Sequence, residues 1–264
     1  MLNFEFERAE SVESAARALE TDPDAKLLAG GQSLIPVLKM EFAEPSRLVS
    51  LGSIDGLKEI KREGDSLSIG AMATHADVEH SEVVREMIPS LADLAHGIGD
   101  AQVRNRGTLG GAIAHADPAA DYPAAIVGYR TQIKTHRRTI AGDDFFTGLF
   151  ETALESGELI TAVNFAPPKA AVYAKFANPA SKYAIVGVLV AQYPDEVRVG
   201  VTGAKATAFR WSALEQRLSS SLRAEGVDSA EMDDDDFMAD LDADEDYRRA
   251  LLRVMAKRAI RSLG

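Results

Sequence analysis

The stretch AGGQSLIPVLKM, residues 29–40, joins a glycine pair to the start of a helix. It follows a short apolar run at residues 27–29 that is typical of a buried strand. Ser33 is suited to cap a helix, and Pro36 is tolerated in a helix only within the first turn. The sequence therefore predicts a strand, a glycine turn and a helix start, in this order.

A second glycine pair, Gly110-Gly111, lies in the stretch GTLGGA at residues 107–112. Each pair has a hydroxyl group beside it, from Ser33 or Thr108. A glycine turn before a helix leaves backbone N–H groups open and lets an anion approach closely. Neither pair has the spacing of a Rossmann or Walker motif, and a single pair is more often a simple turn. Together they favour a dinucleotide pyrophosphate held between two loops.

The rest of the chain alternates strand and helix patterns without a repeat of fixed period, which argues against solenoids and propellers. Pro167-Pro168 is the best boundary between units. Strands are predicted over residues 4–6, 27–29, 47–51, 67–69, 133–140, 158–164, 184–192 and 197–202. Helices are predicted after Ser11 and over residues 74–82, 83–98, 122–127, 211–222 and 246–263, with a split near Pro89. The strands over 184–192 and 197–202 read as an antiparallel hairpin.

Composition excludes several classes of protein. The 264 residues carry 29 Lys and Arg against 41 Asp and Glu, a net charge of −12, so no basic field exists to bind nucleic acid. An apolar fraction of 46% is enough for a core and excludes general disorder. The chain has no cysteine, which excludes disulfides, cysteine nucleophiles, and zinc or iron–sulfur sites held by its own thiolates.

The absence of an export signal and of a run of about 20 apolar residues predicts a cytoplasmic protein without a membrane span. The acidity, with Arg outnumbering Lys, favours a high-salt cytoplasm, where excess surface carboxylate preserves solubility. An ordinary acidic bacterial protein is the alternative.

Motifs for nucleophilic and metal chemistry are missing from the sequence. There is no GxSxG and no HExxH, so no catalytic residue and no metal ligand is predicted. His115, beside the second glycine loop, is interpreted as a hydrogen-bonded structural residue. The acidic run at residues 233–236 lacks the alternation and glycine of a calcium loop and is interpreted as a solvated linker. A dinucleotide cradle without an acid–base pair points to redox chemistry supplied by a cofactor.

Segments along nearly the whole chain resemble the FAD-binding subunit of molybdenum hydroxylases, in the family's order. This family includes the medium subunit of carbon monoxide dehydrogenase and the flavin part of xanthine dehydrogenase. The segments are AGGQSLIPVLKMEFAEPSRLVSL (29–51), IGAMATHADVEHS (69–81), IGDAQVRNRGTLGGAIAHADPAADYPA (98–124), DDFFTG (143–148), GELIT (157–161), YAKFANPASKYAIVGV (173–188) and VTGAKATAFRWSALE (201–215). The short length and the strings AGGQSL and DPAAD favour the carbon monoxide dehydrogenase-like type.

The resemblance implies an α+β fold. Two subdomains of the vanillyl-alcohol oxidase type enclose FAD, and a small α+β C-terminal domain follows. The expected bounds are 1–53 for the first subdomain, 54–167 for the second and 168–264 for the C-terminal domain of the molybdenum hydroxylase flavoprotein type.

The resemblance also implies the residues that bind FAD. The two glycine loops hold the pyrophosphate from opposite sides, and Asp121 bonds the ribose or ribityl chain. Ile160 and Lys175 contact the isoalloxazine ring, Tyr183 lies near the ring face, and Ile98 packs near the adenine. The full set is Ala29, Gly30, Gly31, Gln32, Ser33, Leu34, Ile98, Thr108, Gly110, Gly111, Ala112, Asp121, Ile160, Lys175 and Tyr183.

Two positions depart from the family pattern. Ala112 replaces the usual asparagine and removes one side-chain hydrogen bond, and Ile98 replaces a ring side chain and weakens stacking on the adenine. Neither change affects a backbone cradle, so FAD remains the expected cofactor. It is expected to bind non-covalently, because no cysteine is available and no histidine lies in a tethering motif.

The function implied by the resemblance is electron transfer within a larger oxidoreductase. Molybdopterin and the two-iron clusters must lie on partner chains, a large molybdopterin subunit and a small iron–sulfur subunit, because this chain has no thiolates. The chain alone is then inactive on substrate. The alternatives are a self-contained flavin oxidase or dehydrogenase of the same fold and a flavin-less binding module. The substrate, whether carbon monoxide, a purine, an aldehyde or another heterocycle, is chosen on the absent subunit.

Overall fold

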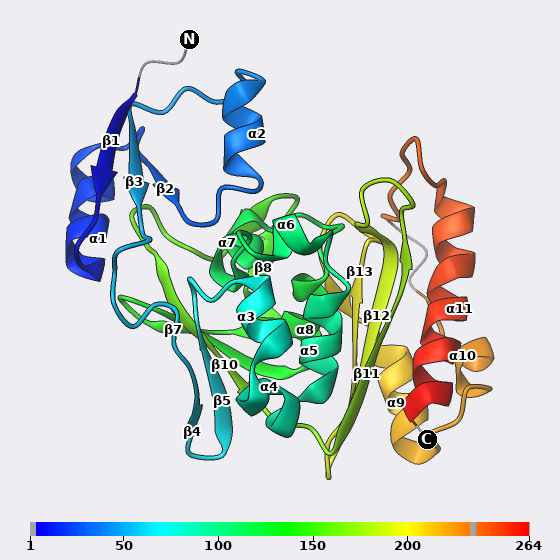
Figure 1. Cartoon of the computed structure of the whole chain (residues 1–264). Helices are drawn as coiled ribbons and strands as arrows, with labels where there is room; N and C mark the ends of the chain where they lie inside the picture. Colours follow the sequence, from blue (N-terminus) through cyan, green and yellow to red (C-terminus); the bar gives the residue numbers. More distant parts are fainter. Residues whose placement is uncertain (1–3, 233–235, 264) are drawn as a thin grey trace.

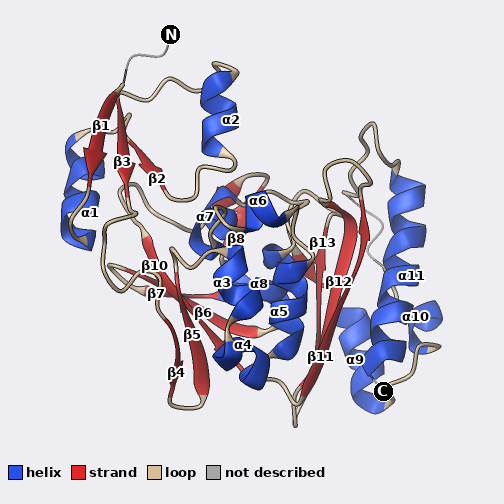
Figure 2. Ribbon diagram, viewed as in Figure 1, coloured by secondary structure: helices blue, strands red, loops and turns tan. Residues whose placement is uncertain are grey.

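The computed structural model describes residues 4–232 and 236–263 of the chain. Figure 1 traces three units along the sequence, from a small N-terminal unit through a central unit to a C-terminal sheet with helices. Figure 2 shows the C-terminal sheet between the central helices on one side and α9 and α11 on the other. The chain is therefore a mixed helix and sheet protein, which confirms the predicted fold class at this level.

A three-stranded parallel sheet in the order β1-β3-β2 forms the N-terminal unit. Helix α1 connects β1 to β2, two parallel strands of this sheet that lie on either side of β3. Ser11 caps this helix through a capping box with Ser14, as predicted, and Ala15 and Ala18 are buried on its inner face. The elements are β1 (Glu5–Arg8), α1 (Val12–Thr21), β2 (Lys26–Leu28), α2 (Leu34–Lys39) and β3 (Arg47–Ser50).

Helix α2 begins where the sequence predicts, but Ser33 does not cap it. Ser33 has φ −99° and ψ −47°, which is helical backbone, and its side chain makes no capping hydrogen bond. A capping side chain reaches the first-turn N–H groups from an extended backbone, so the helical backbone of Ser33 directs its hydroxyl elsewhere. The predicted Ser33 cap is therefore wrong.

The central unit is built on an antiparallel sheet in the order β4-β5-β10-β6-β7. Leu67, Ile69, Val163 and Phe165 of this sheet are fully buried in the central core, where α7 contacts β5 and β10. The strands are β4 (Ile60–Glu63), β5 (Ser66–Gly70), β6 (Arg130–Thr135), β7 (Thr139–Ala141) and β10 (Ile160–Ala166), with a separate hairpin of β8 (Phe146–Gly148) and β9 (Glu151–Thr152). The helices are α3 (His75–His80), α4 (Glu82–Met87), α5 (Pro89–His96), α6 (Ala101–Arg104), α7 (Leu109–His115), α8 (Tyr122–Gly128) and the 3₁₀ turn η1 (Gly142–Asp144).

Local side-chain hydrogen bonds bear on two predictions in this unit. The single strand predicted over 133–140 is wrong, because the Thr135 hydroxyl accepts from the N–H groups of Arg137 and Arg138 and closes a turn between β6 and β7. The helices predicted over residues 74–82 and 83–98, with a split near Pro89, are α3, α4 and α5, and the split before Pro89 is confirmed. Ser81 ends α3 and caps α4 by accepting from the Val84 N–H.

The C-terminal unit is an antiparallel sheet in the order β11-β12-β13-β14. The predicted hairpin is confirmed, with Gln192 paired to Val197. Strand β12 is buried on both faces: Leu189 packs in the central core, and Val188 and Val190 pack under α11. The elements are β11 (Ala170–Ala177), β12 (Ala184–Gln192), β13 (Val197–Thr202), β14 (Phe209–Arg210), α9 (Ser212–Ser220), α10 (Gly226–Ser229) and α11 (Glu245–Leu263).

Two sequence predictions remain, one on the acidic run and one on membrane spans. The acidic run interpreted as a linker lies at 233–236, and residues 233–235 fall outside the described part of the chain. Among the helices of residues 4–232 and 236–263, none is long and apolar enough to cross a membrane.

Candidate functional site

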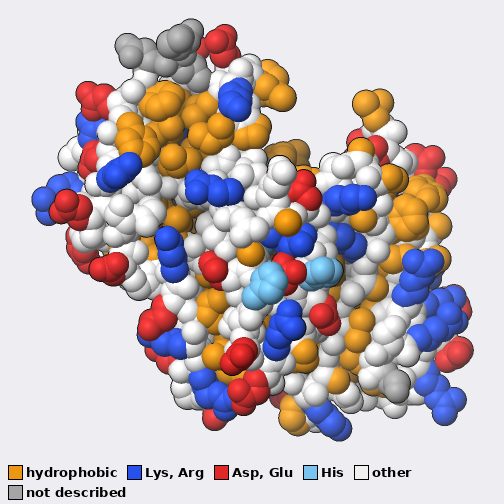
Figure 3. Space-filling model, in the orientation of Figure 1, with side chains coloured by type: hydrophobic (Ala, Val, Ile, Leu, Met, Phe, Trp, Pro, Cys, Tyr) orange, Lys and Arg blue, Asp and Glu red, His pale blue; other side chains and the backbone are white. Residues whose placement is uncertain are grey.

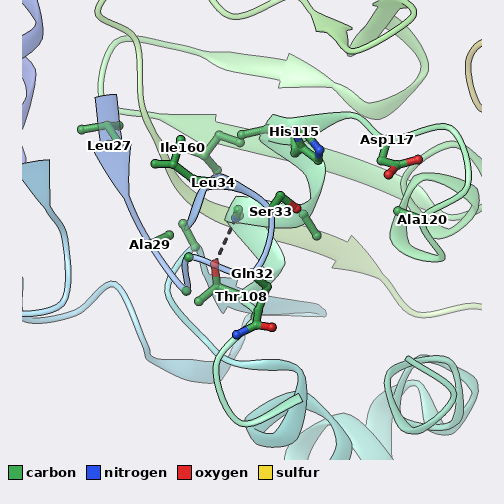
Figure 4. A pocket seen from close by; sticks show the side chains of 18 of the residues that line it. Leu27, Ala29, Gln32, Ser33, Leu34, Thr108, His115, Asp117, Ala120 and Ile160 are labelled. Atoms are coloured by element: carbon green, nitrogen blue, oxygen red, sulfur yellow. Dashed lines mark hydrogen bonds between the residues drawn. The ribbon is translucent and has the colours of Figure 1, made fainter. Parts of the chain in front are cut away.

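A cavity of about 800 Å³ lies where the N-terminal unit, the central unit and the loop before β12 meet. A volume of this size is typical of a pocket for an extended cofactor or ligand. In Figure 4, Gln32, Ser33 and Leu34 from the first glycine loop surround the space together with Thr108 and His115 from α7 and its cap. Every residue predicted to bind the cofactor lines this cavity except Lys175.

The first glycine loop presents unpaired donors to the cavity. The N–H groups of Gly30, Gly31, Gln32 and Ser33 have no hydrogen-bond acceptor within the described residues. Gly31 has φ +75°, a conformation that glycine adopts without strain. Several open N–H groups on one short loop are the feature that binds an anionic phosphate group.

The second glycine loop differs from the first in its hydrogen bonds. The Thr108 hydroxyl accepts from the Gly111 N–H at 3.1 Å, and the Gly110 N–H donates to the Ala71 carbonyl at 2.9 Å. The N–H groups of Gly110 and Gly111 are therefore already bonded, unlike the open donors of the first loop. Its glycines instead allow close packing, because a Cβ on Gly110 would lie 2.6 Å from the Ala71 Cβ.

The two loops touch through their backbones. A Cβ added at Gly30 would lie 2.0 Å from the Arg106 carbonyl oxygen and 2.9 Å from the Gly107 Cα. Only glycine fits this contact, since the opposing atoms are main chain and cannot rotate away. The contact therefore holds the two glycine loops against each other at the cavity wall.

Two cavity-lining side chains that the sequence did not single out have unpaired polar atoms. The Nδ1 of His75 and the hydroxyl of Tyr122 are buried without a hydrogen-bond partner within the described residues. Their rings lie 5.3 Å apart between centroids. Burial, with a smaller contribution from Arg104, lowers the pKa of His75 to about 4. His75 is therefore neutral at pH 7.

His75 is expected to make the protein sensitive to acid. The ordinary histidine pKa is 6.5 and that of His75 is about 4, so between these values the unfolded chain binds a proton that the folded chain rejects. Stability is full above pH 6.5 and falls as the pH drops towards 4. We expect a loss of about 2 kcal/mol between pH 7 and pH 5. Urea unfolding at both pH values measures it.

The control for this prediction is His75→Leu, which should lose about 2 kcal/mol less than the wild type over the same interval. His80→Gln removes a histidine whose side chain is 69% exposed and should keep the wild-type dependence. Equal acid sensitivity of the wild type and His75→Leu would contradict the assignment.

Asp121 lies at the cavity wall as predicted and is 4% exposed. It accepts a hydrogen bond from the Tyr173 hydroxyl at 2.7 Å and from the Lys175 ammonium at 3.0 Å. Burial raises the pKa of Asp121, while Lys175 and Tyr173 act in the opposite direction. Lys175 stands behind Asp121 and does not line the cavity, so its position differs from the predicted contact with the isoalloxazine ring.

His115 also differs from expectation. It lines the cavity, and its ring packs on Phe150 with centroids 5.1 Å apart, while no hydrogen bond to its ring is found within the described residues. The interpretation as a hydrogen-bonded residue is therefore wrong, because its place at the end of α7 directs the ring towards the β8–β9 turn. Leu27, Leu159 and Asp117 line the cavity as well, and nothing in their local sequence pattern distinguishes them.

Comparison with known proteins identifies the family. The model of the FAD binding domain in molybdopterin dehydrogenase matches residues 2–168, more than half of the chain. The chain belongs to this family. The resemblance found in the sequence is thereby confirmed. Both glycine loops of the cavity lie within the matched region, while Ser181, Lys182 and Tyr183 line the cavity from beyond it.

Several known proteins are similar to this chain along almost its whole length. The nicotine 6-hydroxylase medium subunit of Paenarthrobacter nicotinovorans is 34% identical over 268 residues, which cover 96% of this chain and 95% of the relative. The carbon monoxide dehydrogenase medium chain of Hydrogenophaga pseudoflava is 35% identical over 277 residues, with coverage of 97% and 96%. Quinoline 2-oxidoreductase from Pseudomonas putida 86 has a chain of similar structure, with a TM-score of 0.91, 27% identity, and coverage of 99% and 96%.

Proposed function

We propose that this chain is the FAD-binding, electron-transfer subunit of a multi-subunit molybdenum hydroxylase. The observation that carries the proposal is the row of open N–H groups from Gly30 to Ser33 at the wall of a cavity large enough for a dinucleotide. When bound, FAD accepts electrons from iron–sulfur clusters and delivers them to an external acceptor. The clusters lie on a partner, since this chain has no cysteine to hold them.

The residues of the chain bind and orient the cofactor. The open N–H groups of the first loop donate to the pyrophosphate, and Asp121 accepts from hydroxyl groups of the ribose or ribityl chain. Ile98, Ile160 and Tyr183 pack against the ring systems. The second loop contributes its glycines, which allow it to pack closely against Ala71 at the cavity wall.

We also propose how the chain divides into subdomains. We assign residues 1–53 and 54–167 to two subdomains of the vanillyl-alcohol oxidase type and residues 168–264 to the C-terminal domain. The arrangement of the sheets supports this division, because the small parallel sheet, the five-stranded sheet and the four-stranded sheet fall in the three segments.

The proposed setting is a high-salt cytoplasm. A net charge of −12 supports it, because carboxylates keep a protein surface hydrated at high ionic strength. Two measurements test this setting. They are the growth of the source organism in high salt and the stability of the purified protein at molar salt.

The surface of the N-terminal unit supports a role within a complex. Figure 3 shows hydrophobic side chains gathered over this unit. Met40 is 64% exposed, Phe42 78% and Phe6 54%. Exposed apolar patches mark surfaces that partners cover. We assign this patch to contacts within the complex without choosing the subunit.

The proposal is tested by comparing the chain alone with its native complex. The chain is purified from an expression host with FAD, and the complex is isolated through a tag on the same chain. Carbon monoxide, nicotine and xanthine are added without oxygen, and the flavin absorption is followed. We expect a cysteine-rich subunit and a molybdopterin subunit to copurify, and the flavin to be bleached by substrate in the complex only. Oxidation of an organic substrate by the isolated chain would instead support the self-contained flavin enzyme.

A further inference from the structure

The ammonium group of Lys175 makes as many hydrogen bonds as its three N–H donors allow. It donates to the Gly97 carbonyl at 2.8 Å, to the Lys182 carbonyl at 2.9 Å and to the Asp121 carboxylate at 3.0 Å. The Lys175 side chain is 11% exposed, so the group is largely withdrawn from solvent. A buried cation with all donors used holds its acceptors in a fixed relation to one another.

The three acceptors belong to three separate parts of the cavity wall. Gly97 precedes Ile98, which lines the cavity, and Asp121 lines it directly. Lys182 lies in the loop between β11 and β12, whose residues 181–183 line the cavity from the C-terminal unit. Lys175 itself is in β11 and takes no part in the lining. One side chain behind the wall therefore joins segments that are far apart in the sequence.

The loop before β12 needs such a tie. Lys182 has φ +65°, a left-handed conformation that is strained for a residue with a Cβ. Within the loop, the Asn178 side chain accepts from the Ala180 and Ser181 N–H groups, and the Ser181 hydroxyl accepts from the Tyr183 N–H. The Lys175 bond to the Lys182 carbonyl connects this strained residue to Gly97 and Asp121. The end of the loop is also held where the Ala184 N–H donates to the Ala119 carbonyl.

We propose that Lys175 is a positioning residue for FAD, which clamps the 97–99 segment, Asp121 and the 181–183 loop at the spacing that the cofactor requires. The inference rests on the proposed FAD function and differs from a direct contact between Lys175 and the isoalloxazine ring. Arginine cannot replace it, because a planar guanidinium cannot direct its N–H groups at acceptors that converge on one nitrogen.

The chain offers a matched control in Arg248, a second buried cation that ties backbone segments together. Its guanidinium donates to the Ile185 and Gly203 carbonyls, both at 2.6 Å, and pairs with Asp240. None of these acceptors lines the cavity. Loss of a buried cation should therefore lower stability at either residue. A loss of cofactor affinity is expected only when Lys175 is replaced.

The experiment compares Lys175→Met, Lys175→Arg and Arg248→Met in the full chain reconstituted with FAD. FAD affinity is measured from the recovery of flavin fluorescence on dilution, and the melting temperature is measured with and without FAD. We expect both methionine variants to melt at lower temperature. The dissociation constant for FAD should rise at least tenfold in both Lys175 variants and stay within twofold in Arg248→Met, with FAD raising the melting temperature of Arg248→Met as in the wild type.

Limited proteolysis gives a readout at the loop itself. Trypsin cleaves after Lys182, and in FAD-free protein this bond should be cut several-fold faster in Lys175→Met than in the wild type or Arg248→Met. Wild-type affinity for FAD in Lys175→Met, or equal losses in Lys175→Met and Arg248→Met, would overturn the clamp. A wild-type chain that binds no FAD would instead refute the proposed function. Lys175→Gln serves as the second variant if Lys175→Met does not fold.

Discussion

Replacing Gly30 by alanine is expected to abolish FAD binding. The new Cβ would lie 2.0 Å from the Arg106 carbonyl oxygen and 2.7 Å from its carbon, and both atoms are main chain. The two glycine loops must then move apart, and the open N–H groups from Gly30 to Ser33 lose their place at the cavity wall. We expect the affinity for FAD to fall by about a hundredfold or more, equivalent to roughly 3 kcal/mol.

The measurement is the flavin content of the purified protein after reconstitution with excess FAD, from its absorption spectrum. Gly52→Ala is the matched control, because a Cβ at Gly52 would meet only the Ser50 hydroxyl, at 3.6 Å. It should bind FAD like the wild type. Circular dichroism establishes that Gly30→Ala retains its secondary structure. Normal flavin content in Gly30→Ala would show that the loop contact does not define the binding site.

Replacing Asp121 by leucine is expected to damage both stability and cofactor binding. The change leaves the Lys175 ammonium buried without its counter-ion and the Tyr173 hydroxyl without its acceptor. Loss of one partner of a buried ion pair costs about 3–5 kcal/mol. The free energy of unfolding in urea should fall by this amount, and the affinity for FAD should fall with the loss of the carboxylate that faces the cavity.

The double variant Asp121→Leu/Lys175→Met separates the two effects. Removal of both charges leaves no unpaired ion, so the free energy of unfolding should recover by several kcal/mol relative to Asp121→Leu alone. FAD binding should remain weak, because neither the cavity-facing carboxylate nor the clamp is restored. Recovery of FAD affinity together with stability would show that Asp121 acts only through the fold.

Local sequence patterns predicted much of the fold where a short segment contains its own determinant. The α1 cap at Ser11 is confirmed because its partner Ser14 lies one turn away. The hairpin of β12 and β13 is confirmed because Val186 to Val201 form near-continuous apolar runs around a short turn. Strand β11 was not predicted. All of its residues are half-buried, so its sequence lacks a clear alternation of buried and exposed positions. β4 was missed for a related reason, as its IKRE sequence is mostly exposed.

The cavity was predicted through residues whose chemistry is visible in sequence. Paired glycines beside hydroxyl residues predicted the two loops. The resemblance to the family predicted that Ile98, Asp121 and Tyr183 belong to the same site, and all three line the cavity. The sequence could not distinguish the loops from each other. Only the structure shows that the Thr108 hydroxyl and the Ala71 carbonyl occupy the donors of the second loop, while those of the first stay open.

The sequence by itself determined the family, the acidic charge, the lack of thiolates and the positions of the glycine turns, because each depends on residue identity or on neighbours within a few positions. Tertiary structure alone decided the neutral state of His75 and the place of Lys175 behind the cavity wall. Burial and the convergence of Gly97, Asp121 and Lys182 on one ammonium group depend on chain segments that are distant in sequence and meet only when the sheets and helices pack.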